Sequence, residues 1–321
     1  MTNVQAGPLV PEPLINRDFA DPDVLRVADG WHAYSTNSVY GGRLWHVPTQ
    51  RATTLRGPWS EVGDAMPTLP GWVDPVTPNV WAPEISVHDD GRVLLYFTAR
   101  HAALRVQCIG VAIAPSPSGP FTPVGGGPLI LRSGDGDTLD AESFVDTDGS
   151  RYLIYKSGRV YSTMWVQRLA ADGLSTVGDR IEAFRSDRPE EANIVEAPSL
   201  VRRVVDTSGH YVLFYSANTF FSGSYHVNYA TAPSVTGPYT KAPGALLTTD
   251  TIGRTYLNPG HQDVVQDPEG DFLVFHASIN QTARGMFLLG LGWTADGRPA
   301  ILPVPPGVTP PPSDGDLNRL A

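Results

Sequence analysis

Residues 140–155 read DAESFVDTDGSRYLIY, and this stretch decides the fold. It opens with an acid, crosses a polar DTDG turn and enters a run rich in β-branched and aromatic residues, which is the pattern of a β-hairpin. Similar stretches begin at four other places: DPDVLRVADGWHAYS at Asp21, EISVHDDGRVLLYFT at Glu84, EAPSLVRRVVDTSGHYVLFYS at Glu196 and HQDVVQDPEGDFLVFHA at His261. The chain therefore contains five copies of one hairpin, and each opens with an acid or a histidine.

The copies recur about every 60 residues, which leaves room for four short strands per copy and is typical of a radial all-β repeat. A second marker, Gly-Pro followed by an aromatic residue, returns at residues 57–59, 119–121 and 237–239. We therefore predict an all-β, single-domain, five-bladed β-propeller over residues 16–301. Residues 1–15 are predicted to be an irregular lead-in, and residues 302–321 a proline-rich tail.

The second copy departs from the common register. Counting back from its turn glycine, Gly91, by the distance seen in the first, third and fifth copies places Ala82, not Glu84, at the opening position. Glu84 is therefore left out of the candidate set. The only helix that the pattern suggests is a short one over residues 186–192.

Composition excludes several classes of function. A formal net charge of −10 and a pI near 5.2, without a basic run, disfavour nucleic-acid binding. Cys108 is the only cysteine, so no disulfide forms within the chain, and its apolar surroundings predict a buried thiol. No stretch is long and apolar enough for a membrane span, and the N-terminus lacks the features of a signal peptide. We expect a soluble protein that is cytoplasmic or secreted with its leader removed; its oligomeric state is left open.

The acids at the hairpin openings are predicted to meet in space. The first strand of each propeller blade lines the central axis, so Asp21, Asp140, Glu196 and His261 are expected to converge at one mouth of the channel. Like charges at close range raise the pKa of at least one carboxyl, and a raised carboxyl beside an ionised one suits glycoside hydrolysis. Each acid taken singly has another interpretation, because Asp and Glu often flank turns.

The ordered motifs FADPDV, WAPEI, LDAESFVDTDG, VEAPSLV and PGHQDVV, with the closing FHAS, LGW and DGRP, resemble those of glycoside hydrolase family 43. These are five-bladed propeller enzymes that act on arabinan and xylan, so the resemblance implies an inverting hydrolase with three catalytic carboxylates. By this resemblance, Asp21 is the general base that activates water, and Glu196 is the general acid. Asp140 is the acid that orients the general acid and tunes its pKa. His261 matches an axial histidine near a bound ion or water cluster, and Arg284 matches an arginine of the substrate pocket.

One position departs from the family pattern. Ala141 follows Asp140 where the family often has proline. Glu142 lies two residues further along the same strand, on the same face if the strand is regular, and is the rival for the role of modulating acid. We expect the general acid to be the least solvated of the three carboxyls, with a raised pKa.

Aromatic side chains are expected to form the sugar platform, because the C–H faces of a sugar pack on aromatic rings. Trp81 of WAPEI is the leading candidate, with Trp72 and Phe220 or Phe221 further out. Each of these rings could equally belong to the core.

The resemblance favours an exo-acting α-L-arabinofuranosidase that acts on α-1,5-linked plant cell-wall arabinan or its oligosaccharides. A β-xylosidase or a bifunctional xylosidase/arabinofuranosidase is the alternative, and a non-catalytic sugar-binding propeller is the alternative of another class. Loops 62–80 and 218–225 are expected to decide between exo and endo action. No cofactor is expected to be required; a structural Ca²⁺ near the axis, contacted by His261 through water, is left open.

Overall fold

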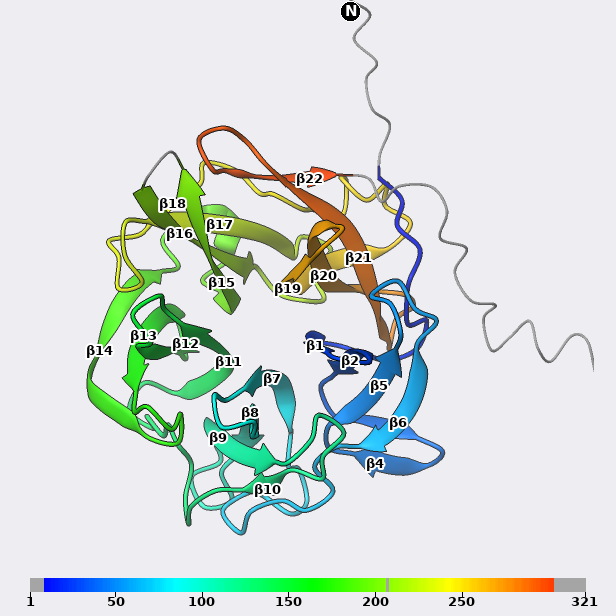
Figure 1. Cartoon of the computed structure of the whole chain (residues 1–321), viewed down its shortest axis with the longest axis vertical. Helices are drawn as coiled ribbons and strands as arrows, with labels where there is room; N and C mark the ends of the chain where they lie inside the picture. The colour runs from blue at the N-terminus through cyan, green and yellow to red at the C-terminus, as the bar shows by residue number, and fades with distance from the viewer. Residues whose placement is uncertain (1–8, 206–207, 303–321) are drawn as a thin grey trace, which may run out of the picture.

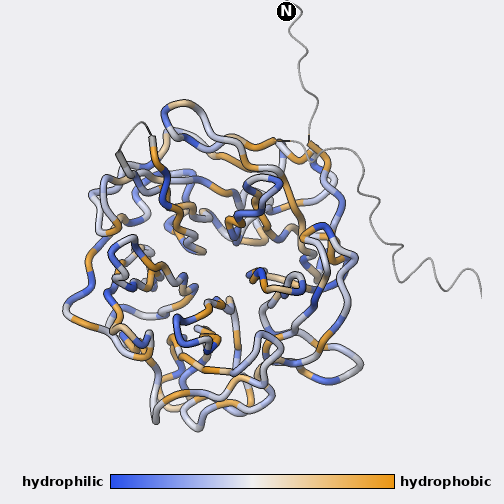
Figure 2. The backbone as a smooth tube through the Cα atoms, in the orientation of Figure 1, coloured by the Kyte–Doolittle hydropathy of each residue, from blue (hydrophilic) through white to orange (hydrophobic). Residues whose placement is uncertain are grey.

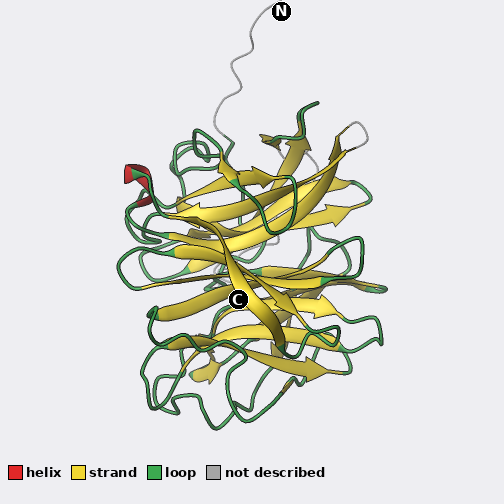
Figure 3. Cartoon of the chain, turned by 90° about the vertical axis from the view of Figure 1, so that its left-hand side faces the viewer, coloured by secondary structure: helices red, strands yellow, loops and turns green. Residues whose placement is uncertain are grey.

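The computed structural model describes residues 9–205 and 208–302. Five four-stranded antiparallel sheets stand around a central axis (Figure 1), which confirms the predicted five-bladed β-propeller. Strands dominate the part of the chain that is described, and its one helical element is a single 3₁₀ turn, η1 (Pro189–Glu191), at the periphery (Figure 3). This turn is shorter than the helix expected over residues 186–192. No helix among these residues is long and apolar enough to cross a membrane.

Each blade is a meander that begins at the axis and ends at the outside. Blade one contains β1 (Asp23–Val27), β2 (Gly30–Tyr34), β5 (Pro48–Ala52) and β6 (Ser60–Asp64), with the hairpin β3 (Ser38–Tyr40) and β4 (Arg43–Trp45) between β2 and β5. Blade two contains β7 (Trp81–Val87), β8 (Val93–Arg100), β9 (Gln107–Ala114) and β10 (Thr122–Pro123).

The other three blades have the same strand order. Blade three contains β11 (Asp137–Val145), β12 (Arg151–Gly158), β13 (Thr163–Leu169) and β14 (Thr176–Arg185). Blade four contains β15 (Val195–Val205), β16 (Ser208–Ala217), β17 (His226–Ala232) and β18 (Thr240–Lys241). Blade five contains β19 (Leu257–Asp267), β20 (Gly270–Ser278), β21 (Arg284–Trp293) and β22 (Pro299–Leu302).

The hydrophobic core is divided among the interfaces between neighbouring blades. Hydrophobic segments occur all around the ring (Figure 2), and strands such as β8 and β20 are buried at most positions, so that both faces of these sheets contribute to burial. Between blades one and two, for example, Tyr34 and Met66 belong to the same buried cluster as Phe97 and Cys108. Burial raises the pKa of the Cys108 thiol to about 12, as expected for a structural cysteine.

The Gly-Pro-aromatic marker occupies equivalent places in three blades. Gly57-Pro58, Gly119-Pro120 and Gly237-Pro238 are all cis, and each glycine has a positive φ. Each marker ends just before or at the start of the outermost strand of its blade, namely β6, β10 and β18. The marker therefore stands at the same position in these three blades, as the spacing in the sequence predicted.

A backbone kink recurs in the inner strand of every blade. A residue at an equivalent place, within the inner strand or just before it, has a left-handed φ in each blade: Asp21 (53°), Ala82 (46°), Asp140 (57°), Ala197 (52°) and His261 (48°). In blades two to five the strand pairing shifts register around this residue. A non-glycine residue in this conformation costs about 1–3 kcal/mol, so neighbouring contacts must hold it.

The kink corrects the sequence alignment of the fourth copy. The residue of blade four that corresponds to Asp21 and Asp140 is Ala197, and Glu196 lies one position earlier. Glu196 pairs with Ser216 just before the register shift, as Leu139 pairs with Lys156 in blade three. The acids at the hairpin openings are therefore not all at matched positions.

The kinked residues join the blades near the mouth of the channel. In four interfaces the backbone N–H of the kinked residue donates to a polar side chain of the preceding blade. The accepting residues are equivalent to one another and lie in the second strand of that blade or just beyond it. The pairs are Ala82 N to Thr36 Oγ1 (3.0 Å), Asp140 N to Thr98 Oγ1 (3.2 Å), His261 N to Ser216 Oγ (2.8 Å) and Asp21 N to His276 Nδ1 (3.1 Å). Burial lowers the pKa of His276 to about 4, so its ring is neutral and its nitrogen can accept.

A second ring of hydrogen bonds, which we call the lower ring, closes the propeller one layer deeper. Each inner strand presents a side-chain oxygen to an N–H of the next blade. The acceptors are Asp23 from Ile85 (2.9 Å), Glu84 from Ser143 (3.1 Å), Glu142 from Leu200 (3.0 Å), Ser199 from Val264 (3.3 Å) and Asp263 from Val24 (3.2 Å). The bond from Val24 joins the first blade to the last, whose strands share no sheet.

The four carboxyls of the lower ring are expected to make stability fall as pH rises. Burial is the main cause that raises the pKa of Asp263 to about 6 and those of Asp23, Glu84 and Glu142 well above their usual values. The unfolded values lie near 4. The stabilisation is therefore complete below about pH 4 and is lost as pH rises through about 6 and beyond.

We expect the Tm to decrease by roughly 5 °C between pH 5 and pH 8, measured by circular dichroism. Glu142→Gln keeps an oxygen for the Leu200 N–H but cannot ionise, so it should reduce this decrease. Glu190→Gln, at an exposed position, is the matched control and should retain the wild-type slope. An unchanged slope in Glu142→Gln would show that these carboxyls do not control the pH dependence.

Candidate active site

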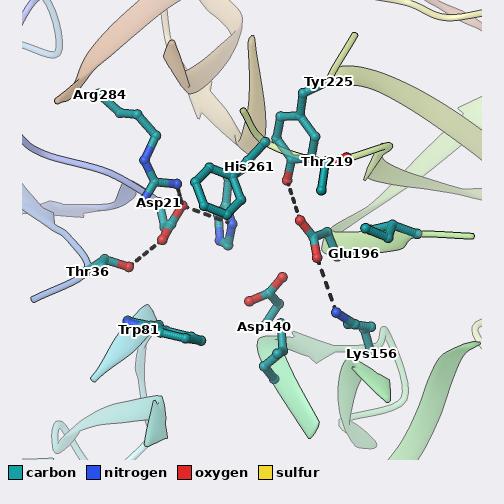
Figure 4. A pocket seen from close by; sticks show the side chains of 13 residues that line it. Asp21, Thr36, Trp81, Asp140, Lys156, Glu196, Thr219, Tyr225, His261 and Arg284 are labelled. Atoms are coloured by element: carbon teal, nitrogen blue, oxygen red, sulfur yellow. Dashed lines mark hydrogen bonds and ion pairs between the residues drawn. The ribbon is translucent and has the colours of Figure 1, made fainter. Parts of the chain in front are cut away.

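A pocket of about 350 Å³ opens at the mouth of the channel (Figure 4). All six side chains that the sequence singled out for the site line it: Asp21, Trp81, Asp140, Glu196, His261 and Arg284. They come from blades one to five, and more than 260 residues separate the first from the last. The remaining lining residues are Thr36, Leu139, Lys156, Ile194, Thr219, Phe220 and Tyr225.

Asp21 lies against Arg284, His261 and Thr36. Nη1 of Arg284 is 3.0 Å from its Oδ1, and Nδ1 of His261 is 3.4 Å from the same oxygen, while the Thr36 hydroxyl donates to Oδ2. Burial acts to raise the pKa of Asp21, but Arg284 and His261 outweigh it and hold this pKa well below its usual value. The carboxyl is therefore ionised at neutral pH and can accept a proton from water.

Glu196 is held by both of its carboxyl oxygens. The Tyr225 hydroxyl donates to Oε1 at 2.9 Å, and Nζ of Lys156 lies 3.3 Å from Oε2. The side chain is 15% exposed, with its carboxyl facing the pocket (Figure 4). This fixed orientation suits a group that must exchange a proton with one particular substrate oxygen.

Asp140 has a raised pKa. Burial raises it to about 7, and the charge of Glu196 adds to the rise, whereas His261 and Lys156 oppose it. Its Oδ2 also accepts the N–H of Ala197 at 3.0 Å, which fixes the backbone directly after Glu196. The prediction that the general acid is the least solvated of the three carboxyls is wrong, since Glu196 is partly exposed whereas Asp21 and Asp140 are buried.

The remaining walls of the pocket are aromatic and apolar. Trp81 faces the pocket from the start of β7, opposite Arg284 (Figure 4). Phe220 stacks near Arg284, with the guanidinium carbon 4.9 Å from the ring centroid. The loop 218–225 thus contributes Thr219, Phe220 and Tyr225, whereas no residue of the loop 62–80 lines the pocket.

Several candidates lie outside the pocket. Trp72 is buried and stacks on Phe97 at 6.0 Å, so it is a core residue and not a sugar platform. Phe221 is 73% exposed and packs edge-on against Phe220 instead of lining the pocket. Glu142 belongs to the lower ring, one layer below Asp140, and this depth removes it as the rival for the modulating role. Glu84 lies in the same ring, in agreement with its exclusion from the set.

Sequence reasoning missed Lys156 and Tyr225, which hold Glu196. Lys156 is one of only two lysines, and it follows directly after the LIY run of the third hairpin. Aligning the second strands of the five hairpins would have shown a lysine where the others have Thr36, Thr98, Ser216 or His276. Tyr225 gives no such signal in the sequence, because it reaches the pocket from a loop. Its ring packs against Gly260, where a Cβ atom would lie 2.1 Å from the ring.

The described residues contain no cluster of side chains that could bind a metal ion directly. No three His, Cys, Asp or Glu side chains among them are placed to share an ion. His261 instead faces the Asp21 carboxylate through Nδ1. The structural Ca²⁺ near the axis stays a prediction.

Comparison with known proteins identifies the family of the chain. A family model described as glycosyl hydrolases family 43 matches residues 10–299. The β-D-galactofuranosidase xynD of Aspergillus niger is 27% identical over 285 residues, covering 80% of this chain and 77% of that protein. The arabinan endo-1,5-α-L-arabinosidase C of Emericella nidulans is 26% identical over 308 residues, covering 86% and 89%.

A solved structure shows the same fold. A thermostable family-43 glycoside hydrolase superposes with a TM-score of 0.76 at 24% identity, covering 92% of this chain and 96% of that chain. The family model spans almost all of the described residues, and the pocket carries the three acids in separate environments. The chain therefore belongs to glycosyl hydrolase family 43 and is a glycosidase.

Proposed function

We propose that the protein is an exo-acting α-L-arabinofuranosidase that releases L-arabinofuranose from α-1,5-linked arabino-oligosaccharides with inversion. The observation that carries this proposal is one pocket in which Asp21 and Glu196 have different partners. Asp21 contacts the guanidinium of Arg284 and the ring of His261, and Glu196 is oriented by a phenol and an ammonium. Two carboxyls with separate roles are what an inverting glycosidase requires.

The proposed reaction gives one step to each of the two carboxyls. Asp21 accepts a proton from a water molecule as that water attacks the anomeric carbon, while Glu196 delivers a proton to the leaving glycosidic oxygen. Asp140, whose pKa is about 7, fixes the backbone after Glu196 through Ala197 and is the nearby group that exchanges protons at neutral pH. Arg284 and His261 keep the base ionised until the water attacks.

The size of the pocket supports exo action. Its volume of about 350 Å³ is at the small end of the range of about 300–1,000 Å³ for small-molecule sites, so one terminal sugar would occupy most of it. Phe220, from the loop 218–225, covers the Arg284 side of the pocket. An endo-acting enzyme needs a groove that continues past the cleaved sugar in both directions.

A furanose is the sugar that the relatives favour. One relative is named for arabinan and another for β-D-galactofuranose. The ring carbons of α-L-arabinofuranose and β-D-galactofuranose have the same configuration, and the two sugars differ in the substituent on C4. A β-D-galactofuranosidase is therefore the second candidate, ahead of the β-xylosidase alternative, whose substrate carries a pyranose ring.

A proton NMR time course with three separate substrates tests the proposal. The substrates are an α-1,5-linked arabino-oligosaccharide, methyl β-D-galactofuranoside and β-1,4-xylotriose. We expect free β-L-arabinofuranose as the first product, with no early shorter oligosaccharides other than those one unit smaller. Release of galactofuranose or xylose alone would replace the sugar assignment, and early internal fragments would replace exo by endo action.

A further inference from the structure

One inter-blade contact near the mouth of the channel breaks the pattern of the other four. Thr36, Thr98, Ser216 and His276 each accept the kinked N–H of the next blade. The corresponding residue of blade three is Lys156, because it stands two residues after Ile154, as Thr98 stands two residues after Tyr96. A lysine ammonium has three donors and no acceptor, so it cannot take this role.

Two neighbouring acids, Asp140 and Glu196, make the contacts that replace this link. The Ala197 N–H, which has lost its acceptor on the preceding second strand, donates to Asp140 Oδ2 at 3.0 Å instead. The Lys156 side chain, only 12% exposed, extends to Glu196, with Nζ 3.3 Å from Oε2. In blade three this position therefore holds a side chain that contacts Glu196 and does not accept the kinked N–H of the next blade.

We propose that Lys156 is a positioning residue that aims the Glu196 carboxyl at the leaving oxygen and stabilises the carboxylate left behind when the proton is delivered. This role rests on the proposed glycosidase function and deepens it, and it does not depend on which sugar is cleaved. Tyr225 holds one oxygen of Glu196 and Lys156 the other, so the carboxyl has one orientation in the pocket.

The charge of Lys156 persists although the side chain is largely buried. Burial acts to lower its pKa, but Glu196 and Asp140 outweigh this effect and raise it. An ammonium fixed beside a group that becomes negative during the reaction acts as preorganised electrostatic stabilisation. The other lysine, Lys241, is also buried and paired with Glu191 at 2.7 Å, but that pair lies beside η1 and outside the pocket.

The test compares wild type, Lys156→Met, Lys156→Arg, Glu196→Gln and the double variant Lys156→Met/Glu196→Gln. For each, kcat/KM is measured against pH on an oligosaccharide that the wild type cleaves, and folding is checked by thermal unfolding. Lys156→Met should lower kcat/KM about 10–100-fold, mainly through kcat, as expected when a general acid is poorly placed. Loss of the neighbouring cation should also move the alkaline limb of the profile about one unit toward higher pH.

Two comparisons separate this role from a structural one. Lys156→Arg keeps the charge and should return the alkaline limb to its wild-type position. In the Glu196→Gln background, Lys156→Met should change kcat/KM less than about twofold, because the two residues act as one unit. An equal loss in both backgrounds, or an unmoved alkaline limb in Lys156→Met, would overturn the proposal.

The same experiment keeps the two proposals apart. If Lys156→Met does not fold, Lys156→Gln is judged by the same criteria. A wild-type protein that cleaves none of the three glycosides refutes the proposed function. Wild-type cleavage without coupling between Lys156 and Glu196 refutes only the role of the lysine.

Discussion

Glu196→Gln is expected to lower kcat/KM on an oligosaccharide by about 10³-fold, within the range that general acid catalysis contributes. The amide retains the size of the carboxyl and an oxygen that can accept from the Tyr225 hydroxyl, which lies 2.9 Å away. It cannot deliver a proton to the leaving oxygen. A nitrophenyl glycoside of the same sugar needs little protonation on departure, so the loss on it should be about tenfold or less.

The measurement is kcat/KM for wild type and variant on both leaving groups. Glu142→Gln is the matched control, since it makes the same change at a buried carboxyl of the lower ring, outside the pocket. That control should retain most of the wild-type activity on both substrates. Equal losses on the two leaving groups in Glu196→Gln would contradict the role of Glu196 as general acid.

Asp21→Asn is expected to lower kcat/KM by about 10³-fold or more on both leaving groups, because each reaction needs an activated water. Asparagine cannot accept the proton of that water. The substitution also leaves Arg284 and His261 without the carboxylate that each contacts, at 3.0 and 3.4 Å. The loss should therefore exceed that of any other single substitution in the pocket when an activated leaving group is used.

The pH profile gives this prediction a second readout. The pKa of Asp21 is held well below its usual value, so the wild type should retain the ionised base down to about pH 4. Asp23→Asn, at the carboxyl two residues further along the chain and one layer deeper in the channel, is the matched control. A loss confined to the oligosaccharide, with the nitrophenyl glycoside cleaved normally, would show that Asp21 does not activate water.

The five hairpins could be predicted from the sequence because each one is specified by local residues. A turn between two β-rich runs is specified by the residues within it, and five copies at a regular spacing permit few architectures other than a propeller. The convergence of Asp21, Asp140 and His261 followed from that architecture, since first strands meet at the axis. The same argument placed Ala82 correctly and removed Glu84.

The position of Glu196, one residue before the kinked residue of its blade, could not be predicted from the sequence, because it depends on where the inner strand kinks. The sequence places an acid at the start of the fourth copy, but only the left-handed backbone of Ala197 shows that Glu196 stands one position early. That shift brings its carboxyl within reach of Lys156 and Tyr225. Trp72 was misjudged for a related reason, since an aromatic ring in a long loop gives no sign of whether it faces sugar or core.

The sequence by itself determined the repeat, the number of blades and the acidic side chains that meet in the pocket, because hairpin patterns and residue types are properties of short segments. The tertiary structure decided which acid is flanked by Arg284 and His261, which one is isolated by burial and which one Lys156 holds. Those partners come from different blades. Their charges set the roles of the carboxyls through distances that exist only once the propeller has closed.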